Sequence, residues 1–275
     1  MLPHVEELCR LAAVGLKGTS MEAKELLELI ERTLDEVMPC ADERPNALHE
    51  AMRYAVGTGG KRIRPLVCLA SAAAVGGRPE DARHPAAAIE LLHNYTLVHD
   101  DLPAMDNDTE RRGKPTVWTK FGEANAILVG DALQALAFQV ASLAPRNAGQ
   151  IASALGAAGL GVVQGQVEDI AATKDVQFIY THKTADLFVA AAVMGGYAGG
   201  GSEADIGALR QFALNLGLAF QYEDDLLDGD SPYPKEKTEE LVRSATAAAI
   251  SALDALPGDT AFLRSLAETL VGRKV

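Results

Sequence analysis

LLHNYTLVHDDLPAMDNDTERRGKP, residues 91–115, is the stretch that decides the fold class and the chemistry of this chain. Its first half has apolar residues at helical spacing and predicts a helix that ends near Asp101. Its second half masses acidic side chains directly before basic ones: Asp100, Asp101, Asp106 and Asp108, then Arg111, Arg112 and Lys114. Carboxylates crowded at the end of an apolar helix repel one another, so without a cation one or more should be driven towards protonation.

The acidic and basic groups of this stretch indicate what could bind there. Mg2+ prefers a few carboxylates together with water and substrate phosphate oxygens, and arginine is a strong partner of phosphate. We therefore expect a Mg2+ site that holds a diphosphate. A solvated acidic loop with local ion pairs is the alternative for one such cluster taken alone.

A second acidic cluster, AFQYEDDLLDG at residues 219–229, favours the metal site over the solvated loop. Asp224 and Asp228 lie four residues apart, and Gln221 lies three before Asp224, so the three share one face of a helix. Two such helices facing each other across a bundle would form a cavity walled by carboxylates, with apolar side chains below. A lipid-like tail could occupy that apolar floor.

The composition supports a helical fold. The chain has 275 residues, of which 48% are hydrophobic and only 5% aromatic, and most apolar residues are Ala and Leu, which favour helix. Helical patterns cover residues 21–38, 84–101, 124–143, 150–170, 179–197, 205–227, 236–256 and 259–271. No alternating strand of any length and no βαβ rhythm is visible. We expect an all-α domain over residues 21–275, preceded by an extension of uncertain origin at 1–20.

Charge and cysteine usage narrow the class of protein. A formal net charge of -13 would repel nucleic-acid phosphates, so we expect no nucleic-acid partner. The three cysteines, Cys9, Cys40 and Cys68, form no CxxC pair, which suits a reducing cytoplasm. The longest uncharged stretch, 147–167, is broken by Gly and Gln, so we expect no membrane span.

A third charged element is GTGGKRIRP at residues 57–65. It places Lys61, Arg62 and Arg64 at an expected helix start, where free backbone N–H groups also favour anions. A phosphate site is one interpretation. A basic patch on the surface is the alternative.

Two further places are ambiguous when taken alone. His93 lies two helical turns before Asp100 on nearly the same face, but a lone histidine there is more often a core residue than a ligand. Lys183 and Thr184 precede an apolar helix, and by themselves they indicate ordinary helix-start chemistry.

Taken together, these motifs resemble the trans-prenyl diphosphate synthases, the bacterial-type farnesyl and geranylgeranyl diphosphate synthases. The resemblance rests on the order of motifs along the chain: GGKRIRP, HDDLPAMD, RRGKPT, FGEANAILVGDAL, GQVED, HKT and FQYEDDLLD. It covers the chain from about Glu22 to the C-terminus, which it implies is a polyprenyl synthase domain. It implies the isoprenoid synthase fold, an antiparallel helical bundle around a deep central cavity. It also implies a Mg2+ cofactor and a homodimer.

The resemblance implies roles for individual residues. Two aspartate motifs would hold Mg2+ against the allylic diphosphate: Asp100, Asp101, Asp106, Asp224, Asp225 and Asp228. The allylic diphosphate would also be gripped by Arg111 and Lys183. Isopentenyl diphosphate would be held by Lys61, Arg64, His93 and Arg112. The reacting carbons would be faced by Thr184 and Gln221.

The implied reaction joins isopentenyl diphosphate to dimethylallyl or geranyl diphosphate after ionisation of the allylic partner. Metal and cationic groups would stabilise the departing diphosphate in a cavity that excludes water. Tyr95 lies five residues before Asp100, ~7.5 Å further down the helix at 1.5 Å per residue, where a growing tail should meet it. In the resembling family an aromatic side chain there, with the two-residue insertion of the first motif, favours farnesyl diphosphate. Geranylgeranyl diphosphate is the alternative.

Two segments depart from the family pattern. After Asp228 relatives usually have a long loop with a GKST-like lysine, whereas GDSPYPKEK follows here almost directly. The stretch between Asp169 and His182 is also a few residues shorter. Lys235 or Lys237 could substitute for the missing lysine.

Three other functions share part of this pattern. A terpene cyclase would share the fold, but its second metal motif normally combines Asn or Asp with Ser or Thr and Glu, whereas this chain repeats DDxxD. A non-catalytic subunit that modifies another synthase would fit the shortened loop but not two intact motifs. His99 and Asp100 resemble the dyad of an HD phosphohydrolase, without its further histidines at suitable places.

Overall fold

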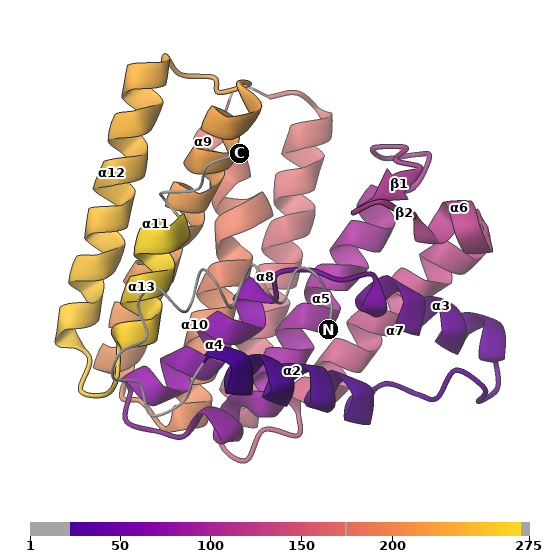
Figure 1. Cartoon of the computed structure of the whole chain (residues 1–275), viewed down its shortest axis with the longest axis horizontal. Coiled ribbons are helices and arrows are strands. Elements are labelled where there is room, and N and C mark those ends of the chain that lie inside the picture. Colours follow the sequence, from indigo (N-terminus) through magenta and orange to yellow (C-terminus); the bar gives the residue numbers. More distant parts are fainter. Residues whose placement is uncertain (1–22, 174, 271–275) are drawn as a thin grey trace.

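The computed structural model describes residues 23–173 and 175–270 (Figure 1). The expected N-terminal extension at 1–20 and the start of the domain at residue 21 lie outside the described residues. Within them the chain is almost entirely helical, which confirms the all-α expectation.

The α-helices follow one another along the whole described chain. They are α2 (Ala23–Val37), α3 (Asn46–Gly57), α4 (Ile63–Ala74), α5 (Arg83–Asp100), α6 (Val117–Phe121), α7 (Glu123–Ala141), α8 (Ala148–Ile170), α9 (Val176–Ile179), α10 (Asp186–Gly199), α11 (Glu203–Asp228), α12 (Lys235–Ala252) and α13 (Ala261–Leu270). Shorter elements are the 3-10 turns η1 (Pro79–Ala82) and η3 (Leu253–Ala255), the π-helical turn η2 (Tyr180–Ala185), and the antiparallel strands β1 (Glu110–Arg111) and β2 (Lys114–Pro115).

Most expected helices differ from the observed ones by a few residues at their ends. Two differences are larger. The expected helix at 179–197 is divided into α9, the π-helical turn η2 and α10, and the expected helix at 236–256 ends as α12 at Ala252, followed by a 3-10 turn. Hydrophobic spacing alone does not distinguish the π-helical turn from an α-helix, because both place apolar residues on one face.

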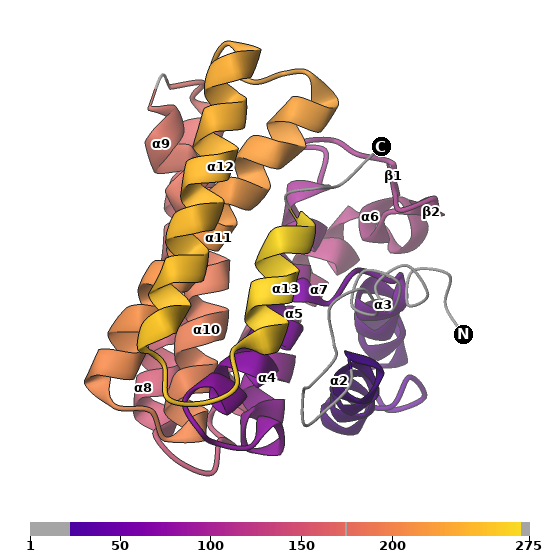
Figure 2. The ribbon, with the colours of Figure 1, turned by 60° about the vertical axis from the view of Figure 1, so that its left-hand side comes forward.

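The helices pack side by side around α5 and α10. α5 contacts α4, α7 and α10, while α10 also contacts α8 and α11, and α11 packs against α12. In Figure 1, α12 forms the left edge of the molecule and α3 lies on the opposite side, and Figure 2 shows α2 and α3 together on the right. α5 is buried over most of its length because small and aliphatic side chains such as Ala86, Ile89 and Leu92 occupy its inner faces.

Two glycines allow helices to approach closely near the expected site. A Cβ on Gly195 of α10 would lie 2.0 Å from the carbonyl oxygen of Cys68 in α4. A Cβ on Gly165 of α8 would lie 2.5 Å from the backbone nitrogen of Lys183 in η2. A side chain at either position would force a backbone segment to move. Gly165 therefore determines how closely η2 packs against α8.

One helix among the described residues, α7, is long and apolar enough to cross a membrane by length and composition alone. Of its most apolar window, 39% is buried inside the fold, where α7 packs against α5 and α3. The expectation of no membrane span stays a prediction.

Candidate active site

The first acidic motif lies at the C-terminal end of α5. Asp100 is the last residue of the helix and Asp101 caps it, and the backbone N–H of Asp106 donates to the Asp100 carbonyl oxygen at 2.9 Å. The buried Asp101 carboxylate accepts a hydrogen bond from Arg111 Nε at 2.7 Å and pairs with its Nη2 at 2.6 Å. Arg111 belongs to β1, so the hairpin folds the basic end of the motif back onto its acidic start.

The carboxylates of this motif repel one another as the sequence predicted. Burial raises the pKa of Asp100 to about 6, and the neighbouring charges of Asp106 and Asp101 act in the same direction. The positive charges of Lys183 and Arg111 oppose this rise in the pKa of Asp100. The ionised form of Asp100 is therefore costly without a bound cation.

The second acidic motif forms the C-terminal end of α11. Asp225 is buried, and its carboxylate accepts hydrogen bonds from the Tyr180 hydroxyl and from Gln221 Nε2, the latter at 2.9 Å. The Thr184 hydroxyl in turn donates to Gln221 Oε1 at 2.8 Å. Burial and the adjacent Asp225 raise the pKa of Tyr180, so its hydroxyl stays a donor at neutral pH. Thr184, Gln221 and Asp225 thus form one hydrogen-bonded chain between η2 and α11.

Lys183 and Thr184 lie in the π-helical turn η2 rather than at an ordinary helix start. π-Helical turns are rare and are frequently found at functional sites. Lys183 Nζ pairs with Asp169 Oδ2 at 2.5 Å, and Asp169 lies near the end of α8. This pair fixes the ammonium group beside the first acidic motif.

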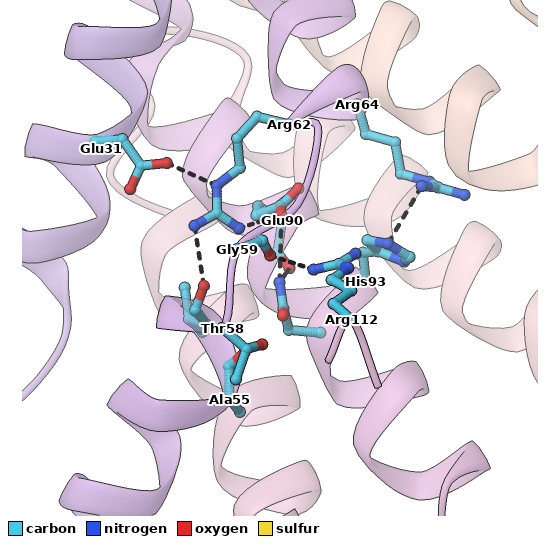
Figure 3. Close-up of polar contacts among 11 residues, drawn as sticks. Glu31, Ala55, Thr58, Gly59, Arg62, Arg64, Glu90, His93 and Arg112 are labelled. Carbon is cyan, nitrogen blue, oxygen red and sulfur yellow. Dashed lines mark hydrogen bonds and ion pairs between the residues drawn. The ribbon is translucent and has the colours of Figure 1, made fainter. Parts of the chain in front are cut away.

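The basic residues of the stretch at 57–65 differ in burial, and Figure 3 shows the contacts of Arg62 and Arg64. Lys61 is exposed, whereas Arg62 is buried. Arg64 is partly buried, and its guanidinium lies 5.0 Å from the centre of the Phe188 ring and 3.3 Å from His93 Nε2. Arg112, which follows the β1 strand, donates from Nη1 to the Gly59 carbonyl oxygen.

His93 and Arg64 leave two buried donors free. Burial lowers the pKa of His93 well below its usual range, and the neighbouring arginines, Arg64 first among them, act in the same direction, so its imidazole is neutral. Arginine can only donate, so His93 Nε2 must accept from Arg64 and the proton sits on Nδ1. His93 Nδ1 and Arg64 Nε are both buried and have no hydrogen-bond partner among the described residues. An oxyanion is the ligand that two such N–H groups fit.

Long-range charge interactions join these parts into one region. Burial lowers the pKa of Arg64 to about 10, Arg112 adds to the lowering, and Glu90 and Asp224 oppose it. Ring contacts connect Arg64 to α11, because Phe188, which lies under its guanidinium, packs against Phe220 at 5.6 Å between ring centroids. The fold brings both acidic motifs and both basic groups together.

The donor set fits Mg2+ that is shared with a phosphate ligand. Within residues 23–173 and 175–270, no three His, Cys, Asp or Glu side chains are arranged to hold a metal ion by themselves. Mg2+ needs only one or two carboxylates when phosphate oxygens complete its shell. The crowded carboxyls at the end of α5, with cations beside them, meet that requirement.

Two expected residues lie towards the edge of this region. Asp228 is exposed at the last position of α11. Tyr95 is buried one helical turn below the first motif, with its ring edge-on to His99 at 5.4 Å between centroids. Of the lysines considered as substitutes for the family's loop lysine, Lys235 begins α12 and Lys237 pairs with Glu240 at 3.0 Å on that helix.

Sequence reasoning did not single out three residues that hold the site together. They are Tyr180, which binds Asp225, Asp169, which pairs with Lys183, and Glu90, which pairs with Arg62. Tyr180 gave no motif signal. Glu90 did give one, because a carboxylate inside an otherwise apolar helix is rare unless it is paired.

The pattern described as "Polyprenyl synthetase" matches residues 45–267. The "Heterodimeric geranylgeranyl pyrophosphate synthase large subunit 1, chloroplastic" of Arabidopsis thaliana is 44% identical over 221 residues, which cover 73% of this chain and 58% of that protein. "Geranylgeranyl pyrophosphate synthase 4" of the same plant is 42% identical over 234 residues, with 79% and 60% covered. The chain thus spans about three fifths of the length of these relatives.

Solved structures resemble the chain over nearly its whole length. An "FPP/GFPP synthase" from Zymomonas mobilis superposes with a TM-score of 0.82 at 34% identity, covering 90% of this chain and 98% of that chain. The "geranylgeranyl pyrophosphate synthetase" from Pyrococcus horikoshii has a TM-score of 0.83 at 30% identity, covering 98% of this chain and 99% of that one. By its sequence pattern, its relatives and its helical architecture, the chain belongs to the polyprenyl synthetase family and has the isoprenoid synthase fold.

Proposed function

We propose that this protein is a trans-prenyl diphosphate synthase, which joins isopentenyl diphosphate to an allylic diphosphate. The observation that carries the proposal is a pair of acidic motifs at the C-terminal ends of α5 and α11, where Arg111 pairs with Asp101 and Gln221 binds Asp225. Beside them Arg64 and His93 contact each other and keep two buried N–H groups that have no partner among the described residues. A single diphosphate would need only one such pairing of charges. Two separate groups of cations suit two diphosphate substrates.

The acidic side would bind the allylic substrate. Bound Mg2+ would neutralise the charge that develops on the departing diphosphate. It would be held by the aspartates of the two motifs: Asp100, Asp101, Asp106, Asp224, Asp225 and Asp228. Arg111 and Lys183 lie beside the first motif and would hold the same diphosphate.

The basic side would bind isopentenyl diphosphate. His93 Nδ1 and Arg64 Nε are buried donors without partners, and a diphosphate oxygen would satisfy them. Lys61, three residues before Arg64 in the chain, and Arg112, which contacts the same loop at Gly59, would add positive charge. These groups leave the diphosphate intact, so their role is to bind and orient the double bond that attacks the allylic carbon.

Thr184 and Gln221 would act on the carbon atoms. The Thr184 proton is committed to Gln221 Oε1, so the lone pairs of the Thr184 oxygen remain available to face positive charge. Gln221 is fixed in turn by its bond to Asp225. When the allylic C–O bond breaks, the double bond of isopentenyl diphosphate forms the new C–C bond and a proton leaves the adduct.

We propose farnesyl diphosphate as the main product and geranylgeranyl diphosphate as the alternative. The buried ring of Tyr95 supports the shorter product, because it lies on the helix below the metal-binding carboxylates. The two Arabidopsis relatives are named for the longer product, and the Zymomonas protein is named for farnesyl and a longer chain. The position of Tyr95 and the names of the Arabidopsis relatives therefore favour products of different chain length.

An apolar surface on α7 and α8 supports the proposal of a homodimer. The exposed large hydrophobic residues of the described chain all lie between residues 127 and 170: Ile127, Leu128, Phe138, Leu143, Leu160, Val163, Val167 and Ile170. On α8 they recur at spacings of three and four residues, so they form one face. Such a contiguous face is typical of a subunit interface. One relative is named a heterodimeric large subunit, so a different partner chain is the alternative.

Product analysis tests the proposed activity. Purified protein is incubated with Mg2+, isopentenyl diphosphate and each of the dimethylallyl, geranyl and farnesyl diphosphates, and the products are separated by chain length. The proposal requires elongated diphosphates that depend on Mg2+. Cyclic hydrocarbons from an allylic substrate alone would indicate a terpene cyclase, and no turnover by the purified chain would indicate a modifying subunit.

A further inference from the structure

Arg62 is the buried basic residue of the 57–65 stretch, and its guanidinium faces Glu31 and Glu90 (Figure 3). Its backbone adopts the left-handed conformation with φ of 48°, directly before the first residue of α4. Its side chain is only 4% exposed. A non-glycine residue pays a conformational cost in this region, so the surrounding contacts must hold it there.

Each of the three nitrogens of the Arg62 guanidinium has a hydrogen-bond partner. Nη1 binds Glu90 Oε1 at 2.7 Å, Nε binds Glu31 Oε1 at 2.8 Å, and Nη2 donates to the Val56 carbonyl oxygen at 2.9 Å. Val56 belongs to the last turn of α3, so Arg62 ties the end of α3 to the start of α4. This bond therefore holds together the two ends of the glycine-rich loop between these helices.

The two carboxylates that contact Arg62 differ in their surroundings. The Glu31 side chain is 44% exposed, whereas the Glu90 side chain is 3% exposed and sits inside α5. Glu90 also accepts a hydrogen bond from Asn94 Nδ2 at 3.3 Å. A buried carboxylate whose Oε1 accepts from both a guanidinium and an amide is held in place, whereas an exposed one is screened by water.

Glu90 faces the whole basic cluster and not only Arg62. Its negative charge acts to raise the pKa of Arg62, Arg64 and Arg112, whereas Arg112 acts to lower the pKa of Arg64 and Arg62 acts to lower the pKa of Arg112. His93 lies one helical turn after Glu90 on the same helix. Glu90 is therefore the buried counter-charge at the point where α3, α4, α5 and the hairpin meet.

We propose that Glu90 is a positioning residue for the isopentenyl diphosphate site, which it serves through Arg62 by fixing the loop that carries Lys61 and Arg64. Glu90 contacts no substrate group itself. Arg62 is buried between Lys61, which is exposed, and Arg64, whose guanidinium lies against Phe188 and His93. The second anchor of the loop is the bond from Arg112 to Gly59. The inference rests on the proposed function, because it names the site that the loop serves.

The test compares variants at both members of the pair. Glu90→Gln keeps the size of the side chain and an acceptor for Arg62 but removes the charge. We expect the KM for isopentenyl diphosphate to rise about tenfold or more, with the KM for geranyl diphosphate changed less than twofold. Glu31→Gln is the matched control, since it removes the exposed partner of the same arginine, and it should change neither KM more than twofold.

A double-mutant cycle shows whether Glu90 acts through Arg62. Arg62→Gln should raise the KM for isopentenyl diphosphate to a similar extent. The double variant should be no worse than either single variant, because each substitution removes the same interaction between Glu90 and Arg62. Effects that multiply would overturn the proposal, and so would a lower KM in Glu90→Gln, which would mean that Glu90 merely repels the diphosphate.

If Glu90→Gln does not fold, Arg62→Lys replaces it. This variant keeps the charge but loses the fork that reaches Val56 and Glu31, and it should raise the KM about threefold to tenfold.

Calorimetric binding of inorganic diphosphate without Mg2+ keeps this proposal separate from the activity. In the absence of metal the acidic motifs repel the anion, so it should bind at the basic side. We expect the wild-type protein to bind it and Glu90→Gln to bind it about tenfold more weakly. If the wild-type protein shows no elongation but this difference is seen, the positioning role stands and the proposed function fails. Equal binding by both proteins would overturn the positioning role.

Discussion

Asp100 is a carboxyl group whose negative charge the fold makes costly. Its pKa in the folded protein is about 6 against an ordinary value of 3.8, because it is buried beside other carboxylates. The folded protein thus holds the Asp100 proton more tightly than the unfolded chain. The stabilisation from this group is present below about pH 4 and is lost as the pH rises to about 6.

This linkage predicts that Asp100→Asn stabilises the metal-free protein at neutral pH. In EDTA at pH 7.5 the variant should have a free energy of unfolding about 1–3 kcal/mol higher than the wild type, because the amide carries no charge to bury. At about pH 4 the two proteins should be equally stable. Denaturant unfolding at both pH values measures the difference. The same gain at both would show that charge is not its cause.

The aspartates are also the residues on which turnover should depend most. Asp100→Ala and Asp224→Ala each remove a carboxylate that would hold Mg2+, so we expect kcat to fall about a thousandfold or more. The melting temperature should change by only a few degrees, since neither side chain belongs to the apolar core. Asp42→Ala, at an exposed position outside the site, serves as the control. Near-normal activity in either site variant would contradict the metal assignment.

Tyr95 should limit the length of the product. Tyr95→Ala removes a buried ring and deepens the space below the acidic motif, so the products should shift from C15 to C20 or longer, as measured by chromatography of the dephosphorylated alcohols. Tyr95→Phe keeps the ring and removes only the hydroxyl, and it should leave the length unchanged. If Tyr95→Ala makes the same products as the wild type, another residue forms the floor.

Among the elements, the contact of α10 with α4 depends on Gly195. Gly195→Ala would place a methyl group 2.0 Å from the Cys68 carbonyl oxygen, so the two helices must separate. We expect a loss of about 1–3 kcal/mol in the free energy of unfolding. Gly207→Ala in α11 is the matched control, because nothing lies within 4 Å of the added methyl, and it should stabilise by about 0.5–1 kcal/mol. Denaturant unfolding of both variants measures the contrast, and a stable Gly195→Ala protein would contradict the packing.

For the whole molecule, the apolar face of α7 and α8 predicts self-association. Leu160→Glu places a charge on a side chain that is 61% exposed in the single chain but would be buried between two copies. Light scattering should show a wild-type mass twice the 29.0 kDa of one chain and a variant mass of one chain. Ala248→Glu, at an exposed position on α12, should leave the dimer intact. A monomeric wild type that pairs only with another synthase subunit would contradict the homodimer.

The amino-acid sequence by itself determined the helical class, the approximate ends of most helices and the two acidic motifs. These features are local, because hydrophobic spacing and the crowding of charges act over a few neighbouring residues. Burial is the main cause of the raised pKa of Asp100, and the repulsion expected from Asp106 and Asp101 adds to it. The resemblance to prenyl synthases rested on the order of such local motifs.

Only the tertiary structure decided which side chains of each motif face one another. Lys61, Arg62 and Arg64 look equivalent in the sequence, and Arg62 turns inwards because Glu90, 28 residues away, offers it a buried partner. The bond from Tyr180 to Asp225 spans 45 residues, and no local pattern announces it. Partners this far apart meet only after the helices have packed, since burial and charge pairing depend on the neighbours that packing brings.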